Sequence, residues 1–186
     1  MKDLVDVALA VQALCLSNKW KFCFIGGLAV QYWGEPRLTR DVDLSLLTGF
    51  KGEEVFIDLL LNSFDPRIDQ AKEFALENRV LLLKTKTGIG IDVAFAALPF
   101  EEVIIDRAKD QEISTGKHVR LCSAEDLIIL KAFASRPIDW RDVEMIIARQ
   151  GRENLDWNYI ERNLAELVLL KEEPEILARL QKLKTK

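Results

Sequence analysis

The sequence predicts an α/β fold, called α+β in some schemes, in which a small mixed β-sheet is flanked by helices and followed by a helical C-terminal region. Three observations predict it. Up to Cys122, short apolar runs typical of buried strands alternate with amphipathic segments. From Ser123 onward, the apolar residues recur at helical spacing only. Apolar residues make up 49% of the 186 residues, which is enough to form a core and argues against disorder.

The first elements lead into the segment that carries most of the candidate chemistry. Gly34 and Pro36 interrupt the helical pattern that precedes them. Asp41 then introduces the next apolar run. The expected elements are a helix over 3–17, a strand over 22–25, a short helix over 28–33 and a strand over 42–47.

The middle of the chain is expected to add a hairpin to the sheet. Two apolar runs flank a turn that contains Gly88, which is a hairpin signal. Asp65 and Pro66 are expected to interrupt the helical pattern and so to separate two helices. The expected elements are helices over 53–62 and 68–78, strands over 79–85 and 89–95, a helix over 99–109, and a small hairpin over 112–115 and 118–121.

The C-terminal part is expected to be helical throughout. Ser123 is a good N-cap and is followed by acidic residues in the first turn. Gly151 is placed as a C-terminal cap glycine, and Asp156 as the N-cap of the helix that follows. The expected helices cover 123–135, 139–149, 156–170 and 174–184. The sequence therefore divides into regions 1–122 and 123–186, with one continuous domain as the alternative.

Gly26 and Gly27 follow the first strand directly. Glycine has no Cβ, so backbone N–H groups can approach a ligand closely. The helix that begins there directs its positive dipole end to the same place, which favours phosphate. The pair therefore predicts a phosphate-binding turn.

Asp41 and Asp43 are two residues apart on a predicted strand, so both carboxylates point to the same face. Two crowded carboxylates repel each other unless a cation or a basic group lies between them. Mg²⁺ is the expected cation, because it prefers carboxylate oxygen and keeps open positions for phosphate.

Asp92 lies within a largely apolar strand. An unpaired buried carboxylate would cost several kcal/mol, so Asp92 needs a partner. Two interpretations follow: Asp92 sits at an edge or cap position, or it joins Asp41 and Asp43 as a third carboxylate.

These residues resemble a known signature. An apolar residue, Gly26-Gly27, a spacer over Leu28–Arg40 and an apolar-flanked Asp-x-Asp are similar to the signature of the DNA polymerase β-like nucleotidyltransferase superfamily. The spacer lies toward the long end for that superfamily. The stretches Gly26–Val30 and Arg37–Leu44 resemble the bacterial AbiEii-type branch, which includes toxins of toxin–antitoxin systems. The resemblance extends over 22–142.

The resemblance implies that region 1–122 is a nucleotidyltransferase core. A nucleoside triphosphate would bind with its phosphates near Gly26 and Gly27. Asp41 and Asp43 would hold Mg²⁺ or Mn²⁺, with two ions expected. Asp92, in the context Ile91–Phe95, would be the third metal ligand and would orient the proton of the attacking hydroxyl. All three aspartates are therefore the expected catalytic residues.

A second stretch, over 127–142, also resembles the AbiEii-type branch, in which it forms the other wall of the nucleotide cleft. Lys131, Arg136, Asp139 and Asp142 fit that pattern. The resemblance implies that region 123–186 closes the cleft and that Lys131 and Asp139 bind nucleotide. Further candidates for phosphate or acceptor contacts are Arg37, Thr39 and Arg40. The alternative is that these charges form local ion pairs only, such as Arg136 with Asp139.

Composition limits the partners. The net charge of −4 makes the chain a poor general binder of nucleic acid. The odd number of cysteines, Cys15, Cys23 and Cys122, predicts reduced core residues of a cytoplasmic protein. No apolar run approaches the length of a membrane span. The expected partners are a nucleoside triphosphate and a hydroxyl acceptor on RNA, a protein or a small molecule, and an antitoxin is a further candidate.

Two other functions fit parts of the sequence. A glycosyltransferase could use Asp-x-Asp to hold a metal and a sugar nucleotide, but it gives the glycine pair no role. A nucleotidyltransferase-like module could bind nucleotide or a partner without turnover. The presence of all three carboxylates argues against this second alternative.

Overall fold

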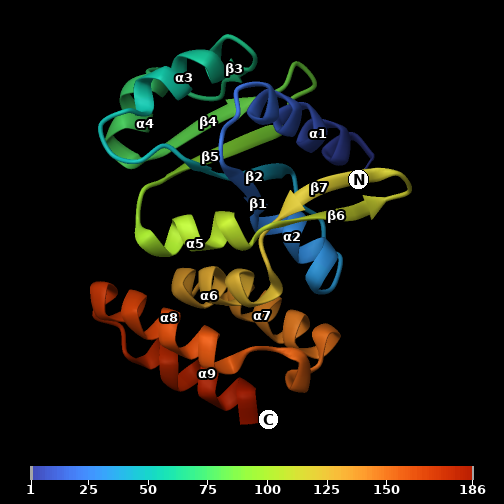
Figure 1. Ribbon diagram of the computed structural model, residues 1–186, viewed down its shortest axis with the longest axis vertical. Helices are drawn as coiled ribbons and strands as arrows, with labels where there is room; N and C mark the ends of the chain where they lie inside the picture. The colour runs from blue at the N-terminus through green and yellow to red at the C-terminus, as the bar shows by residue number, and fades with distance from the viewer. Residues whose placement is uncertain (1, 186) are drawn as a thin grey trace. The chain divides into compact units, whose positions relative to one another are not determined.

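The computed structural model describes residues 2–185 and divides into two compact units (Figure 1). Unit 1 contains the chain up to Leu28 and Leu38–Cys122, and unit 2 contains Ala29–Arg37 and the chain from Ser123. Residues 1 and 186, the outer ends of the two predicted regions, lie outside the described residues. One helix, α2 (Gly26–Trp33), contributes to both units.

Unit 1 is built on a mixed sheet of seven described strands in the order β3-β4-β5-β2-β1-β7-β6. Strand β2 is parallel to β5 and antiparallel to β1, and β1 is parallel to β7. This confirms the predicted α/β fold with a mixed sheet. The elements beside α2 are α1 (Lys2–Ser17), β1 (Phe22–Ile25), β2 (Asp41–Leu47), α3 (Glu53–Leu61), β3 (Asp65–Pro66), α4 (Ala71–Asn78), β4 (Val80–Lys84), β5 (Gly90–Ala96), α5 (Pro99–Arg107), β6 (Lys109–Ser114) and β7 (Lys117–Leu121).

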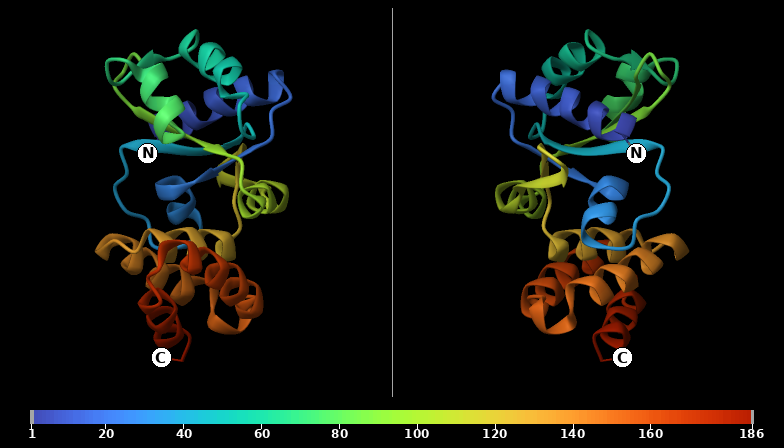
Figure 2. Two further views of the ribbon diagram at one scale, coloured as in Figure 1. Left: turned by 90° about the vertical axis from the view of Figure 1, so that its left-hand side faces the viewer. Right: turned by 90° about the vertical axis from the view of Figure 1, so that its right-hand side faces the viewer.

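The core of unit 1 lies against the central strands. Helices α1, α3 and α4 cover one side of the sheet, and α5 packs on the other side (Figures 1 and 2). On β2, the side chains of Val42, Leu44 and Leu46 are fully buried. Burying side chains of this size stabilises a fold by about 1.5–3 kcal/mol each. The alternation leaves Asp41 and Asp43 on the opposite side of the strand.

Strand β3 is the strand that sequence reasoning missed. Asp65 and Pro66 pair with Lys84 and Leu83 of β4, where only an interruption between two helices was expected. Proline lacks an N–H donor, and it is tolerated here because β3 is the edge strand of the sheet. The N–H of Arg67 then donates to the carbonyl oxygen of Leu82 at 2.9 Å, so the helix expected from residue 68 begins only at Ala71.

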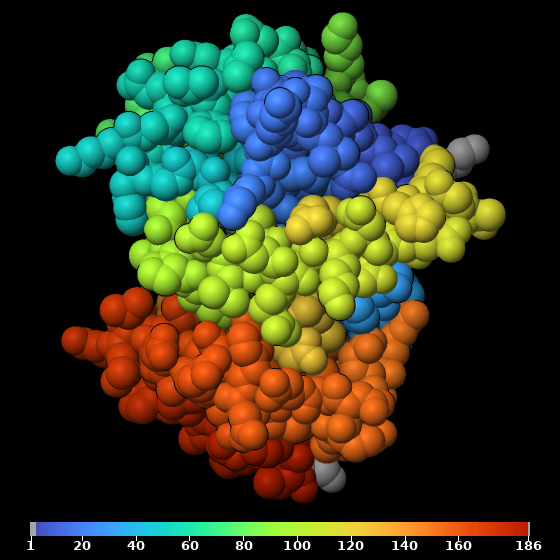
Figure 3. Space-filling model, in the orientation of Figure 1, coloured from blue at the N-terminus to red at the C-terminus, as the bar shows by residue number. Residues whose placement is uncertain are grey.

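Strand β6 forms the other edge of the sheet. The β6–β7 hairpin lies at the margin of the molecule in the space-filling view (yellow, Figure 3). Charged residues at Lys109, Asp110 and Glu112 occupy this strand. Charges on an exposed edge disfavour pairing with another chain.

Unit 2 is helical in its described residues beyond Ser123. The hydroxyl of Ser123 accepts the N–H of Asp126 at 3.1 Å, and the carboxylate of Asp156 accepts the N–H of Tyr159 at 3.0 Å, so both predicted N-caps form. The elements are α6 (Ala124–Ala134), α7 (Pro137–Gln150), the 3₁₀ helix η1 (Arg152–Asn154), α8 (Trp157–Lys171) and α9 (Glu175–Thr185).

The segment Ala29–Arg37 is packed into unit 2, although it is distant in sequence from the other residues of that unit. The side chain of Gln150 donates to the carbonyl oxygen of Trp33 at 2.6 Å, and that of Arg149 donates to the carbonyl oxygen of Gly34 at 2.5 Å. A Cβ on Gly34 would lie 3.0 Å from Ile146 Cγ1. The end of α2 therefore packs closely against α7.

All three cysteines are buried in the reduced form, as the sequence predicts for core residues. Burial raises the pKa of the Cys15 thiol to about 12, so this thiol stays protonated and unreactive at neutral pH. Among the described residues, none of the helices is long and apolar enough to cross a membrane.

Candidate functional site

Three aspartates lie in one row on unit 1. Asp43 on β2 and Asp92 on β5 are Cα partners in the parallel ladder. Paired residues on neighbouring strands share a face, and Asp41 is two residues from Asp43, so the three carboxylates lie on the same side of the sheet. The side chain of Asp41 is 44% exposed and that of Asp92 is 30% exposed. The row is therefore partly accessible to water and ligands.

Glycines make room for two of these carboxylates. A Cβ on Gly26 would lie 2.0 Å from Asp43 Oδ2, and one on Gly90 would lie 2.0 Å from Asp41 Oδ1. Gly26 also has φ +59°, which favours glycine. Sequence reasoning assigned the glycine pair to phosphate binding and did not single out Gly90. The geometry shows that Gly26 and Gly90 are needed for the carboxylates themselves.

The start of α2 lies against Asp43. The N–H of Gly27 donates to Asp43 Oδ2 at 3.1 Å, so the positive end of the helix faces a site carboxylate. Thr39 is packed at the same place, because a Cβ on Gly27 would lie 2.4 Å from Thr39 Oγ1. The Thr39 hydroxyl donates to the carbonyl oxygen of Asp41 at 3.3 Å. The structure thus brings Gly26, Gly27 and Thr39 together with the aspartates.

Arg67 is a second residue of this site, besides Gly90, that sequence reasoning missed. Its Nη1 lies 3.4 Å from Asp41 Oδ1, and its Nη2 lies 2.6 Å from Asp92 Oδ1. The repulsion expected between paired carboxylates indicated that a basic group was needed. The sequence could not show which one, because Arg67 reaches the row only through the pairing of β3 with β4.

Asp92 is the least well satisfied carboxylate that the structure describes in the row. Its Oδ1 is buried and accepts no hydrogen bond of good geometry from the described residues, although Arg67 lies close to it. Burial raises the pKa of Asp92, and the neighbouring charge of Asp41 adds to the rise, while Arg67 opposes it without cancelling it. Arg67 therefore compensates the carboxylate of Asp92 only in part.

The donor chemistry of the row suits Mg²⁺ or Mn²⁺, which bind carboxylate oxygen. A cation would also satisfy the buried Oδ1 of Asp92. Within residues 2–185, no three His, Cys, Asp or Glu side chains are close enough together to hold a metal ion. The cation between Asp41 and Asp92 is the guanidinium of Arg67.

The other predicted nucleotide-binding residues form an ion network within unit 2. Lys131 is only 7% exposed, and its Nζ lies 2.9 Å from both Asp139 Oδ1 and Asp142 Oδ2. Arg136 Nε lies 2.6 Å from Asp139 Oδ2. Arg37 donates from Nε to Asp142 Oδ1 at 2.8 Å and from Nη2 to Asp142 Oδ2 at 2.9 Å. These pairs match the alternative of local ion pairing, and nucleotide binding by Lys131, Asp139 and Arg37 stays a prediction.

The network changes the pKa values of its two aspartates. Burial alone would raise the pKa of Asp139 and Asp142. Hydrogen bonds and charges from Lys131, with Arg136 at one carboxylate and Arg37 at the other, outweigh burial and lower both pKa values. Arg40 lies outside this network and is exposed next to the start of β2.

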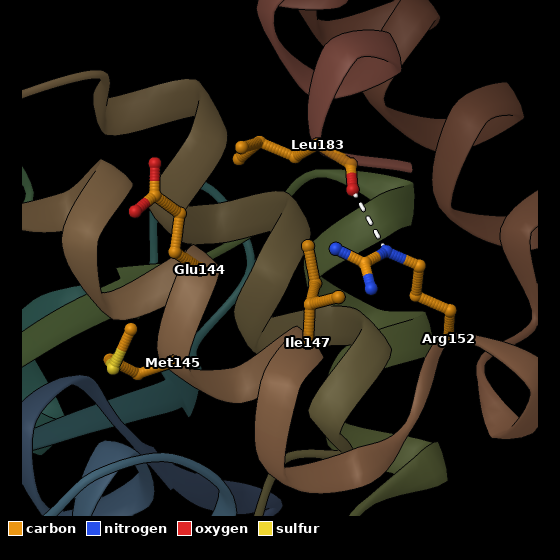
Figure 4. Close-up of a pocket in the computed structure, with 5 residues that line it drawn as sticks. All are labelled: Glu144, Met145, Ile147, Arg152 and Leu183. Carbon is orange, nitrogen blue, oxygen red and sulfur yellow. Dashed lines mark hydrogen bonds between the residues drawn. The ribbon is translucent and has the colours of Figure 1, made fainter. Parts of the chain in front are cut away.

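A separate pocket of about 320 Å³ lies in unit 2 (Figure 4). Arg152 Nε donates to the carbonyl oxygen of Leu183 at 3.1 Å, so the charged group on one side is already tied to α9. The other residues that line the pocket are mostly apolar. The complete lining consists of Glu144, Met145, Ile147, Arg152 and Leu183, none of which is a predicted site residue. The carboxylate row is therefore the better candidate site.

The fold is that of nucleotidyltransferases, as solved structures show. No family model matches the chain, and no curated protein sequence matches it. An antigenic nucleotidyltransferase-like protein from Paracoccidioides brasiliensis has a TM-score of 0.57 and 17% identity, covering 96% of this chain and 94% of that one.

Two antibiotic-related proteins share the fold. The solution structure of the antibiotic-resistance factor ANT(2'')-Ia has a TM-score of 0.61 and 15% identity, covering 94% of this chain and 98% of that one. The lincosamide antibiotic adenylyltransferase LnuA, in its lincomycin-bound form, has a TM-score of 0.51 and 13% identity, covering 74% of this chain and 92% of that one. At these identities the likeness shows the fold alone.

Proposed function

We propose that this chain is a metal-dependent nucleotidyltransferase that moves a nucleoside monophosphate from a nucleoside triphosphate to a hydroxyl acceptor. The observation that carries the proposal is the in-register pairing of Asp43 with Asp92, which aligns three carboxylates beside the start of α2. The nucleotidyltransferase fold of the neighbouring structures supports it.

Each residue of the row has a role in this proposal. Asp41, Asp43 and Asp92 would hold Mg²⁺ or Mn²⁺, with two ions expected from the resemblance to the polymerase β-like superfamily. When bound, a divalent cation would neutralise phosphate oxygens and draw charge from the α-phosphate as pyrophosphate leaves. Gly26 and Gly27 would let the triphosphate approach the backbone at the start of α2.

Asp92 is the proposed acceptor of the proton from the attacking hydroxyl. A general base works best when its pKa lies near the operating pH. Burial raises the pKa of Asp92 toward that range. With a cation at the buried Oδ1, the other carboxylate oxygen of Asp92, Oδ2, would take the proton.

The other candidate nucleotide-binding residues fall into two groups, those that lie near the row and those that are already engaged in ion pairs. Thr39 packs at the glycine turn and Arg40 is exposed beside β2, so a phosphate near the row would lie within reach of both. Lys131, Asp139 and Arg37 are engaged in their own network. For Lys131 to bind phosphate, it would have to release at least one aspartate.

The acceptor must offer a hydroxyl group, which RNA, proteins and many small molecules do. A net charge of −4 disfavours a long nucleic acid. The lincomycin-bound adenylyltransferase among the neighbours gives a small hydroxyl compound a structural precedent. A toxin neutralised by an antitoxin protein is the AbiEii-type version of the same proposal.

A second function is favoured by one observation. Arg67 already neutralises part of the charge of the carboxylate row, so the chain can keep these carboxylates close together without a metal ion. A nucleotidyltransferase-like module that binds nucleotide or a partner without turnover would have this property.

The test measures triphosphate binding and pyrophosphate release with and without Mg²⁺, for each of the common nucleoside triphosphates and for RNA, protein and aminoglycoside acceptors. Asp43→Asn removes a site charge and keeps an acceptor for Gly27. Asp110→Asn makes the same chemical change at an exposed position on β6. We expect Asp43→Asn to lose at least about a hundredfold in turnover, because it weakens transition-state charge stabilisation, and Asp110→Asn to match the wild type.

The outcomes separate the two functions. Wild-type turnover by Asp43→Asn would show that the carboxylate assignment is wrong. Triphosphate binding that does not depend on Mg²⁺ and is not followed by pyrophosphate release, with every acceptor class, would favour the non-catalytic module.

A further inference from the structure

Arg67 holds two carboxylates that come from different strands. Its two terminal nitrogens reach Asp41 on β2 and Asp92 on β5. A guanidinium frequently binds both oxygens of a single carboxylate with its planar fork. Here the fork is divided between two carboxylates. Arg67 therefore stands where a cation shared by the row would stand.

The backbone around Arg67 is fixed to the sheet. Asp65 and Pro66 pair with β4, and the N–H of Arg67 donates to the carbonyl oxygen of Leu82. Leu82 is the Cα partner of Asp92, so the arginine side chain must cross β4 to reach the row. Two strand spacings of about 4.7–4.9 Å each separate β3 from β5, and an extended arginine side chain and an aspartate side chain together span that distance. The position of the guanidinium thus follows from strand pairing.

The pairing leaves the row incompletely satisfied. The contact between Nη1 and Asp41 Oδ1 is long, at 3.4 Å. Asp92 Oδ1 lies 2.6 Å from Nη2 without hydrogen-bond geometry of good quality. The single charge of Arg67 is shared between two carboxylates. A compact divalent ion would balance these oxygens better than the divided fork does.

We infer that Arg67 is the resident cation of the carboxylate row, and that a divalent cation binds there only when the guanidinium leaves. The two cations would share Asp41 Oδ1 and Asp92 Oδ1, and their like charges repel at such short separation. This inference rests on the proposed function for the claim that a divalent cation binds. It adds that Arg67 sets the cation concentration at which the row fills.

The test is a calorimetric titration with Mn²⁺ alone, without nucleotide. Arg67→Gln removes the guanidinium, and Lys84→Gln removes the same charge from an exposed position on β4. Lys84 is the Cα partner of Gly90, so it lies on the face that carries Asp92. We expect Arg67→Gln to bind Mn²⁺ about tenfold more tightly, equivalent to about 1.4 kcal/mol. Lys84→Gln should stay within about twofold of the wild type, because solvent and salt screen an exposed charge.

Thermal unfolding gives a readout that is independent of activity. With a chelator present, we expect Arg67→Gln to melt below the wild type, because the carboxylates have lost their cation. Saturating Mn²⁺ should raise its melting temperature more than it raises that of the wild type. Arg67→Lys keeps the charge without the fork and serves if Arg67→Gln folds poorly; its Mn²⁺ affinity should lie between the other two.

Equal Mn²⁺ affinity for the wild type, Arg67→Gln and Arg67→Lys would overturn the inference. If Asp92→Asn then lost that affinity, the cation site of the proposed function would still stand. Mn²⁺ binding that survives Asp41→Asn with Asp92→Asn would refute the cation site, and the inference with it.

Discussion

The position of Gly26 requires glycine for two reasons, because its φ is positive and because there is no room for a Cβ atom. Replacing it with alanine adds backbone strain and places a methyl group 2.0 Å from Asp43 Oδ2. We expect Gly26→Ala to lower the free energy of unfolding by about 2–4 kcal/mol, the sum of a strained φ and an overpacked contact. Urea unfolding followed by circular dichroism measures the change.

The matched control is Gly116→Ala. Gly116 has φ +71°, and no heavy atom of the described residues lies within 4 Å of the place that an alanine methyl group would take there. This variant therefore reports backbone strain alone. The difference between the two variants isolates the clash with Asp43. Equal losses of stability would mean that the carboxylate is not held against Gly26.

The residues of the carboxylate row show what sequence can predict at this scale. Asp41 and Asp43 share a face because of strand periodicity, which is a local property. Asp92 joined them through its context within an apolar strand and through a family resemblance. Arg67 and Gly90 were missed, because their contacts with the row depend on pairing between strands that are distant in sequence.

At the scale of single elements, the junction of α6 and α7 depends on one buried lysine. Lys131 neutralises Asp139 and Asp142, which are 0% and 2% exposed. After Lys131→Met, Arg136 would still compensate Asp139 and Arg37 would still compensate Asp142. We therefore expect Lys131→Met to destabilise the chain in urea unfolding by more than about 1 kcal/mol, the cost of an unmade buried hydrogen bond, and by less than the roughly 3–5 kcal/mol of a buried charge without a partner. Lys182→Met, on the exposed side of α9, should change stability by less than about 0.5 kcal/mol.

The same network predicts a pH dependence. The pKa values of Asp139 and Asp142 are lowered in the folded state from the ordinary value of 3.8. At a pH between the lowered and the ordinary value, the unfolded chain binds more protons, so stability falls as pH falls. The contribution is complete above pH 3.8 and is lost as pH drops through the lowered values.

The measurement is the urea midpoint as a function of pH below neutrality, for the wild type and Asp142→Asn. The variant lacks one of the two titrating groups, so its midpoint should fall less steeply in the acid range. The pKa of Asp92 is raised in the folded state, so its effect has the opposite sign. Its contribution to the stability of the folded chain increases as pH falls from the raised pKa toward the ordinary pKa of an aspartate. Identical acid limbs for the two proteins would contradict the assignment to Asp142.

Most helices and strands could be predicted, because apolar periodicity and caps are local signals. The predicted strand over 22–25 matches β1, and Ser123 and Asp156 cap helices as expected. Strand β3 could not be predicted, because two residues carry no period and Pro66 usually ends a strand. Its pairing with β4 is a tertiary effect that overrides this preference.

At the scale of the whole molecule, the two units are interleaved in sequence. A fragment that ends at residue 122 contains Ala29–Arg37 but lacks the helices on which that segment packs. Trp33 and Gly34 would lose their hydrogen bonds to α7, and Arg37 would lose Asp142. We expect fragment 1–122 to unfold at lower urea concentration than the full chain and with reduced cooperativity. Circular dichroism during a urea titration is the measurement.

A full-length control that carries Arg37→Gln separates one lost ion pair from the loss of the whole unit. It should shift the midpoint less than the truncation does. A fragment that unfolds as cooperatively as the full chain, at the same midpoint, would show that Ala29–Arg37 does not depend on unit 2. The sequence could not reveal this dependence, since it lies in contacts made more than a hundred residues apart.

The buried thiols have a practical consequence for following the two units separately. Cys15, Cys23 and Cys122 all belong to unit 1, whereas three of the four tryptophans, Trp33, Trp140 and Trp157, belong to unit 2. The rate at which a thiol reagent labels the chain therefore reports opening events in unit 1. Indole fluorescence reports mainly on unit 2. The unmodified chain thus carries two independent probes, and agreement between them would mark a single concerted opening.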